Sequence, residues 1–151
     1  MHNRKGRIAV DDIAYTCIAL RLRLLNRVVT NLYDDALRPL GLKVSQLNLL
    51  VATAKLGLAQ PAKVCEILQL DTSTLSRNVE RMRAKGWLEV VSEEDARTQP
   101  FRVTGQGNKL LARAFPAWER AQKEATKILG EEGIALLDEM AGKLGFPCSG
   151  S

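Results

Sequence analysis

The chain has 151 residues, a length that suits one domain with a single hydrophobic core. Hydrophobic residues make up 46% and charged residues 26%, which excludes wholesale disorder and a fibrous repeat. The 22 basic residues outnumber the 17 acidic ones and give a formal charge of +5, which favours polyanionic partners. No stretch has the ~20 apolar residues of a membrane span, and Asp11 and Asp12 interrupt any signal peptide, so we expect a cytoplasmic protein.

Residue types that carry most enzyme chemistry are scarce in this sequence. The one histidine is His2, and the three cysteines, Cys17, Cys65 and Cys148, lie far apart. The sequence also lacks a glycine-rich phosphate loop and a close carboxylate pair beside a base. We therefore expect a protein that is not an enzyme and that uses neither a metal ion nor another cofactor.

The first long periodic segment, residues 11–38, is predicted to be a helix with two adjacent apolar stripes. The stripes consist of Ile13, Cys17, Leu20, Leu24 and Val28, and of Ile18, Leu22, Leu25, Val29 and Leu32. Because the polar row is narrow, the helix needs two covering surfaces, one from its own chain and one from a partner. Pro39 and Gly41 end it. Residues 1–10 are expected to be a flexible end.

Three shorter helices are predicted next, over residues 44–55, 61–68 and 71–86. In the third, Asp71 is a suitable amino-terminal cap and Gly86 a suitable stop. At 100° per residue, Leu75, Val79 and Met82 share the inner face of this helix, whereas small polar residues and arginine point outward. A short helix, a tight turn and such a second helix are typical of a helix-turn-helix.

The remaining segments predict a projecting hairpin and two terminal helices. Residues 88–91 and 101–103 alternate apolar and polar side chains, as strands do, and the connection between them is longer than an ordinary hairpin loop. A long helix follows from about residue 105 to 129, with a kink expected at Pro116, and Gly130 separates it from a last helix over 131–144. Residues 145–151 are expected to be a flexible end.

Four segments in order resemble the MarR family of winged helix-turn-helix regulators. Leu40 to Gln46 precede the second helix, Leu70 to Leu75 open the third, and Gly86 to Leu88 enter the hairpin. The fourth segment, Ser92 to Arg97 followed by Val103 to Gly107, is similar to the Asp-x-Arg wing signature of the family and its Leu-Thr-x-x-Gly continuation. The resemblance covers most of the chain from residue 17 to 144.

The resemblance implies a mainly α fold with a small β-hairpin wing, assembled as a homodimer. Residues 11–38 and 105–144 would form the helical dimerisation region, and residues 43–104 the winged helix-turn-helix that binds double-stranded DNA. The doubly striped first helix and the apolar seams of the last two helices independently favour a second copy of the chain, because one chain of 151 residues cannot cover them.

Two-fold symmetry would place two recognition helices about 34 Å apart, so the expected target is a pseudo-palindrome read in the major groove. Arg77 is the best candidate for reading a base, because its planar fork can bond two guanine acceptors. The remaining candidates for base or phosphate contacts on this helix are Thr72, Ser73, Thr74, Ser76 and Arg81. For the hydroxyl residues the alternative role is helix capping, and for Arg81 it is a solvated surface charge.

In the wing, Arg97 resembles the arginine that enters the minor groove in this family, and Asp95 resembles the residue that orients the loop. A surface ion pair is the alternative for both. Regulation by a small aromatic ligand or by thiol oxidation is also implied by the resemblance. Candidate pocket residues are Arg21, Arg27 and Trp118, and the candidate redox residue is Cys17, whose alternative role is packing.

The leading functional hypothesis is a transcriptional regulator of the MarR type, repressor or activator. The alternative is a winged-helix protein-interaction module that does not bind DNA. Salt separates the two, because DNA binding releases counterions and weakens steeply as ionic strength rises.

Overall fold

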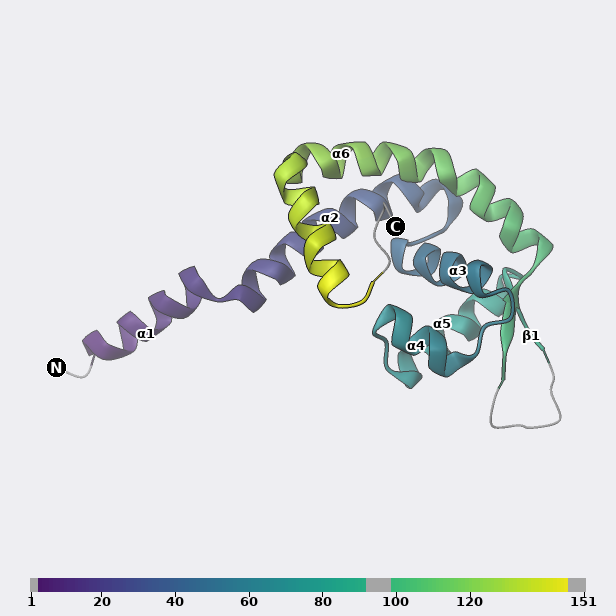
Figure 1. The fold of residues 1–151 in the computed structure, drawn as a ribbon, viewed down its shortest axis with the longest axis horizontal. Helices are drawn as coiled ribbons and strands as arrows, with labels where there is room; N and C mark the ends of the chain where they lie inside the picture. Colours follow the sequence, from purple (N-terminus) through teal and green to yellow (C-terminus); the bar gives the residue numbers. More distant parts are fainter. Residues whose placement is uncertain (1–2, 92–98, 147–151) are drawn as a thin grey trace.

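The computed structural model describes residues 3–91 and 99–146 of the chain. The described part is mainly helical, with one two-stranded antiparallel hairpin, as the sequence predicted (Figure 1). In chain order the elements are α1 (Asn3–Thr16), α2 (Ile18–Leu37), the 3-10 turn η1 (Arg38–Leu40), α3 (Val44–Leu56), α4 (Pro61–Leu68), α5 (Thr72–Ala84), β1 (Leu88–Val90), β2 (Phe101–Val103) and α6 (Gly105–Lys143).

The helices α3, α4 and α5 and the hairpin enclose one hydrophobic core. Leu50, Val64, Met82 and Phe101, one from each of α3, α4, α5 and β2, are at most 1% exposed. Leu110 at the start of α6 joins the same cluster, so the core continues from the hairpin into the last helix. We call residues 43–104 the winged unit.

The hairpin is short and its register is fixed on both edges of β2. Glu89 lies opposite Arg102, and their side chains form an ion pair with Nε and Oε1 2.5 Å apart. On the other edge Phe101 exchanges two backbone hydrogen bonds with Ala59, at 2.8 and 3.0 Å. The connection between α3 and α4 therefore acts as a third, one-residue strand that braces the base of the wing.

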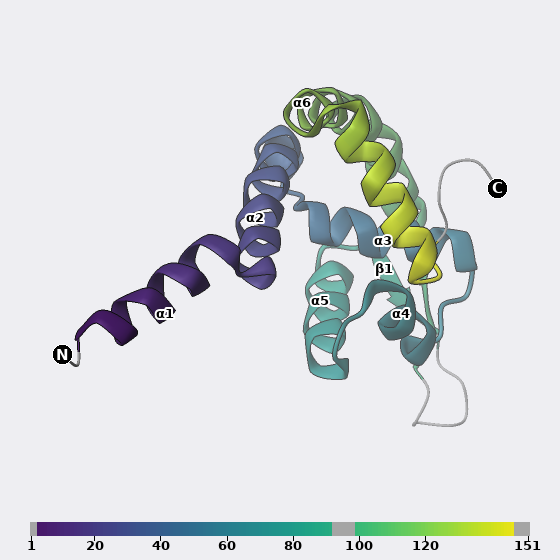
Figure 2. The ribbon, with the colours of Figure 1, turned by 60° about the vertical axis from the view of Figure 1, so that its left-hand side comes forward.

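Outside the winged unit, α2 packs along α6 (Figures 1 and 2). Small buried side chains on α6, Ala114, Ala121 and Ala125, allow close approach of a neighbouring helix. The Tyr33 hydroxyl of α2 donates a hydrogen bond to Gln122 Oε1 of α6, and partial burial raises the pKa of Tyr33. The carboxyl half of α2 is more buried than its amino half.

The predicted single helix over residues 11–38 was wrong at its amino end. Residues 3–16 form a separate helix, α1, which includes residues expected to be flexible and projects away from the molecule in both views (Figures 1 and 2). The break falls at Cys17, whose backbone is extended at ψ 112°. The Arg21 guanidinium donates to the carbonyl of Tyr15, which satisfies one of the acceptors that the break leaves without a helical partner.

The last helix contains both of the residues at which an irregularity was predicted, Pro116 and Gly130. The backbone of α6 stays helical through Pro116 and leaves helical geometry at Gly130, with φ 70° and ψ 166°. Gly130 does separate the final helical segment, as predicted, because glycine adopts this positive φ without strain. At the end, Phe146 donates a backbone hydrogen bond to Ala141 at 3.0 Å, so residues 145 and 146 close the helix rather than forming a loose tail. Residues 147–151 lie outside the described part.

Candidate nucleic-acid interface

The helix α5 is held by its inner face and presents its outer face to solvent. Leu75 and Met82 are 2% and 0% exposed and pack into the core of the winged unit, as predicted. Ser73, Arg77 and Arg81 are exposed. The Arg77 guanidinium donates to the Thr74 hydroxyl at 3.5 Å and helps to lower the pKa of Asp71 by its charge, but it takes part in no ion pair with another described residue.

A hydrogen-bond network at Asp71 fixes where α5 begins. One carboxylate oxygen of Asp71 accepts from the Thr74 amide at 2.7 Å and from the Ser73 hydroxyl at 2.6 Å, and the other accepts from the Thr74 hydroxyl at 2.8 Å. The bonds from Ser73 and Thr74 hold the pKa of Asp71 well below its usual range. The predicted cap is therefore present, and it recruits two hydroxyls that were also DNA-contact candidates.

The four hydroxyl candidates thus divide into two pairs. Ser73 and Thr74 donate their protons to Asp71 and keep only acceptor capacity for a further partner. Thr72 and Ser76 are exposed and make no side-chain hydrogen bond to another described residue. Thr72 and Ser76 are the pair free to donate to a phosphate or a base.

A hollow of about 120 Å³ separates α5 from the base of the wing. Thr72, Ser76 and Arg83 line it from α5, and Gln99 and Phe101 from the wing side. The free hydroxyls consequently face the space between the recognition helix and the hairpin. Asp95 and Arg97, the two wing candidates, lie outside the described residues.

The base of the wing is locked to α6 by Thr104 and Gly107. The Thr104 hydroxyl donates to the Gly86 carbonyl at 2.5 Å and accepts from the Gly107 amide at 3.0 Å, so it both caps α6 and ties it to the end of α5. A Cβ atom on Gly107 would lie 2.3 Å from the Trp87 carbonyl oxygen. This contact explains the need for glycine at the end of the motif that resembled the family signature.

The basic residues after Arg77 differ in whether other groups of the protein engage their charges. Arg81 is exposed, whereas Arg83 approaches Glu80 at 3.4 Å on the helix surface. Lys85 donates to the Gly41 carbonyl at 3.1 Å and lies 4.5 Å from the centre of the Trp87 ring. Lys85 is therefore engaged within the fold, and Arg81 is the freer phosphate candidate on this helix.

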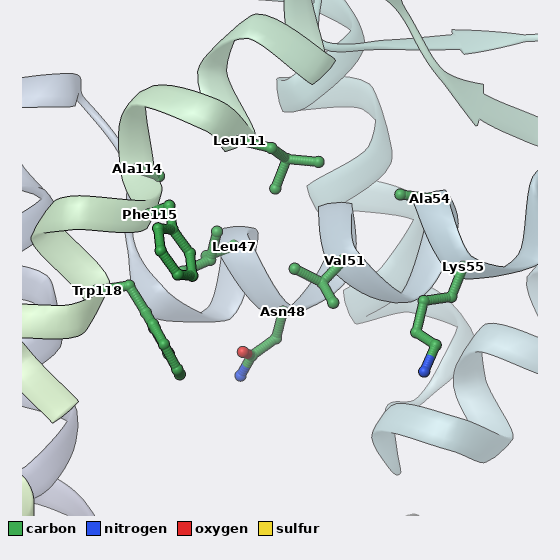
Figure 3. A pocket seen from close by; sticks show the side chains of 9 residues that line it. All are labelled: Leu47, Asn48, Val51, Ala54, Lys55, Leu111, Ala114, Phe115 and Trp118. Atoms are coloured by element: carbon green, nitrogen blue, oxygen red, sulfur yellow. The ribbon is translucent and has the colours of Figure 1, made fainter.

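An apolar groove of about 580 Å³ lies between α3 and α6 (Figure 3). Phe115 and Trp118 from α6 stack with ring centroids 5.7 Å apart, and Val51 faces them from α3. Asn48 and Lys55 extend polar ends toward the open side of the groove (Figure 3). The prediction that Trp118 lines a pocket is consistent with this groove.

The other two predicted pocket residues do not line the groove. Arg21 and Arg27 are exposed on α2, and Arg21 caps the break after α1. Their role in a ligand pocket with Trp118 stays a prediction, because helical periodicity gives the face of a residue but not which neighbouring helix that face meets. Sequence reasoning missed Phe115, Asn48 and Lys55, although the three-residue spacing of Phe115 and Trp118 on one helix signals an aromatic pair.

Cys17, the candidate redox residue, is partly exposed and occupies the extended position between α1 and α2.

Among the described residues, no helix combines the length and the apolar character needed to cross a bilayer.

This arrangement defines the class of winged helix-turn-helix proteins, and comparison with known proteins gives the family. A profile of the MarR family matches residues 40–98. The transcriptional regulator MosR of M. tuberculosis, solved in complex with DNA, is 30% identical, with 85% of this chain and 98% of that chain covered and a TM-score of 0.70. The chain belongs to the MarR family of transcriptional regulators.

Two further solved structures share the fold. A cysteine-to-serine mutant of E. coli MarR, complexed with operator DNA, aligns with a TM-score of 0.77 at 21% identity, covering 88% of this chain and 96% of that one. BpsR of Bordetella bronchiseptica, whose DNA binding is regulated by 6-hydroxynicotinic acid, aligns with a TM-score of 0.75 at 18% identity, covering 86% and 94%.

Proposed function

We propose that this regulator binds pseudo-palindromic double-stranded DNA as a homodimer, with α5 in the major groove and Arg97 in the minor groove. The observation that carries the proposal is the exposed Arg77 guanidinium on a helix whose start is fixed by Asp71 and whose inner face is buried. A rigid helix that projects an unpaired arginine fork suits bidentate recognition of guanine. The DNA complexes of MosR and E. coli MarR support this use of the fold.

The homodimer is supported by the apolar surface that one chain leaves in water. Ile18, Leu22 and Leu24 of α2 are 72%, 54% and 56% exposed, and Leu144 at the end of α6 is 74% exposed. Contiguous apolar surface of this kind on a globular chain marks an interface. A two-fold dimer through α1, α2 and the end of α6 would cover it with the same surface of a second copy.

Binding to duplex DNA selected from a random pool tests the DNA assignment. Arg77→Ala should weaken binding by about 1 to 3 kcal/mol and relax the preference at one base position of each half-site. Arg97→Ala should weaken binding most for sites with an A·T-rich minor groove beside each half-site. Arg120→Ala is the matched control, because it removes one exposed arginine from α6 and leaves α5 unchanged.

Two results would contradict the proposal. If Arg77→Ala and Arg97→Ala bind the selected duplex as tightly as the wild type, these arginines do not read DNA. If binding is insensitive to salt, the alternative of a protein-interaction module gains support, because a DNA contact with several phosphates loses affinity steeply as salt rises.

We further propose that the groove between α3 and α6 binds a small aromatic acid that changes DNA affinity. Its volume of about 580 Å³ is within the usual range for ligand pockets, about 300 to 1,000 Å³. The stacked Phe115 and Trp118 suit a flat ring, and the Lys55 ammonium at the rim suits a carboxylate. The regulation of BpsR by an aromatic acid supports the same ligand class.

Tryptophan fluorescence and DNA affinity, measured together during titration, test this ligand site, and Trp118→Phe is the control that leaves only Trp87. We expect benzoate and 6-hydroxynicotinic acid to quench the fluorescence and alter DNA affinity, and benzamide to do so more weakly because it lacks the charge. Lys55→Met should remove the preference for the acid over the amide. If the fluorescence changes on titration but DNA affinity does not, the ligand binds without regulating the protein. That outcome would contradict the regulatory role.

Thiol oxidation is a second proposed route of regulation, favoured by the position of Cys17 at the break between two helices. Peroxide would convert the thiolate to a sulfenic acid and would itself be reduced to water. The sulfenic acid adds a polar oxygen at this break. Peroxide should then lower DNA binding of the wild type and spare Cys17→Ser. An equal loss in both proteins would remove Cys17 from the mechanism.

A further inference from the structure

The connection between α2 and α3, residues 38–43, joins the helical region to the winged unit. We call it the α2–α3 joint. It begins with the turn η1, and Gly41 ends this turn with φ 64°. Leu37 before the joint and Leu42 within it are 0% and 2% exposed and belong to the core of the winged unit. The angle between α2 and the recognition helix depends on how firmly this joint is held.

From the side of α2, the joint is held by Asp34. Its Oδ1 atom accepts a hydrogen bond from the Val44 amide at 2.8 Å, at the first position of α3. The residue that should cap α3, Lys43, carries an ammonium group with no acceptor atom. Gln46 Oε1 accepts from the Lys43 amide at 3.0 Å, which leaves the Val44 amide to a carboxylate from another helix. Asp34 therefore caps α3 from across the joint.

From the side of the recognition helix, the same joint is held by Lys85. This residue is the carboxyl-terminal cap of α5, and its Nζ atom donates to the Gly41 carbonyl at 3.1 Å, 44 residues away in sequence. The Trp87 ring, 4.5 Å from the ammonium, is 8% exposed and fixes the direction of the side chain by a cation–π contact. The end of α5 is thereby attached to the joint that Asp34 attaches to α2.

We propose that Asp34 and Lys85 are positioning residues that fix the recognition helix relative to α2 and so set the spacing of the two recognition helices in the homodimer. The inference rests on the proposed dimeric DNA binding. Neither side chain needs to touch DNA. A rotation at the joint displaces α5 in both copies, so the misfit at one half-site is doubled across the two-fold axis.

The sharpest test compares two neighbouring carboxylates. Asp35 differs from Asp34 by one position, and it pairs only with exposed Arg38 among the described residues. Electrostatics alone predicts that Asp34→Ala and Asp35→Ala both bind DNA slightly more tightly, because each removes a negative charge. Positioning predicts instead that Asp34→Ala binds the selected duplex about tenfold more weakly, the usual size of a lost helix cap, while Asp35→Ala does not.

Half-site spacing supplies a readout that a purely structural role would not move. Wild type and Asp35→Ala should bind the selected site more tightly than sites with one base pair inserted or removed between the half-sites. Asp34→Ala should lose most of this preference, and Asp34→Asn, whose amide oxygen can still accept from Val44, should retain it. An unchanged preference in Asp34→Ala would overturn the role of Asp34.

Lys85→Met tests the other side of the joint and does not depend on Asp34→Ala folding. Its matched control is Arg83→Met, which removes an equal charge from the same end of α5. We expect Lys85→Met to lose spacing preference and Arg83→Met to keep it. If Lys85→Met instead lowers the salt slope by about 0.9 per protomer with its spacing preference intact, Lys85 is a phosphate contact and not a positioning residue.

The wild type separates failure of this inference from failure of the proposed function. If the wild type binds no duplex, or binds without any spacing preference, dimeric DNA reading fails and the positioning role falls with it. If the wild type prefers one spacing and all the joint variants share that preference, the proposed function stands and the inference about Asp34 and Lys85 is overturned.

Discussion

The winged unit and the helices that flank it differ in how they bury apolar side chains. In the winged unit, Leu50, Met82 and Phe101 are at most 1% exposed, because helices and hairpin cover one another. In the amino half of α2, Leu22 and Leu24 are more than half exposed although the sequence is just as apolar. The winged unit covers its own apolar side chains, whereas the flanking helices leave theirs exposed, as the proposed homodimer requires.

A charge introduced on the exposed apolar face of α2 should have the largest effect. Leu24→Glu would bury a carboxylate twice in a two-fold interface, so we expect dimer dissociation to become at least about a hundredfold easier. Leu58→Glu is the matched control, since Leu58 is 44% exposed but lies in the winged unit. Analytical ultracentrifugation across protein concentrations measures both. A Leu24→Glu dimer as tight as the wild type would place the interface elsewhere.

The contact between the start of α6 and the winged unit offers a second test, with a smaller effect. Gly107→Ala forces a Cβ atom against the Trp87 carbonyl, so the free energy of unfolding should fall by about 1 to 3 kcal/mol. Gly105→Ala meets no atom within 4 Å and should leave stability unchanged or slightly higher, because alanine favours the helix. Urea denaturation at equilibrium compares the two. Equal losses would mean that glycine is not required by the close approach at Gly107.

The smallest expected effect is on the pH dependence of stability, through the Asp71 cap in the winged unit. The pKa of Asp71 is lowered in the folded state, so the cap stabilises the fold fully above the unfolded value of about 3.9. This contribution is lost progressively as the pH falls below that value. In Asp71→Asn the amide can still cap but does not titrate, so thermal unfolding followed by circular dichroism should depend less on pH below about 4. Parallel curves for the two proteins would contradict the capping role.

The winged unit was the part that sequence predicted best. The bounds of α4 and β2, the Asp71 cap and the inward face of Leu75 and Met82 all follow from local signals. The break at Cys17 was not predictable, because neither proline nor glycine marks it. Pro116 carried a local signal for a kink, which stays a prediction because its torsion angles are helical, whereas the predicted separation at Gly130 is present.

Contacts between distant segments were the other part that sequence did not reveal. Asp34 caps α3 from α2, and nothing in the sequence of its own helix indicates this contact. The contact of Lys85 with the Gly41 carbonyl spans 44 residues, so the local sequence around Lys85 gives no sign of it. Trp118 lines a groove, whereas Arg21 and Arg27 do not, because the path of α2 relative to α6 is a tertiary property.

The bonds at Asp71 have a calorimetric consequence. Because they come from Ser73 and Thr74, residues of the same turn, the recognition helix starts at Thr72 without help from any ligand. The recognition helix α5 therefore does not have to form when the protein meets an operator. Heat-capacity changes on association should lack the contribution that folding of α5 would add to that of the buried surface.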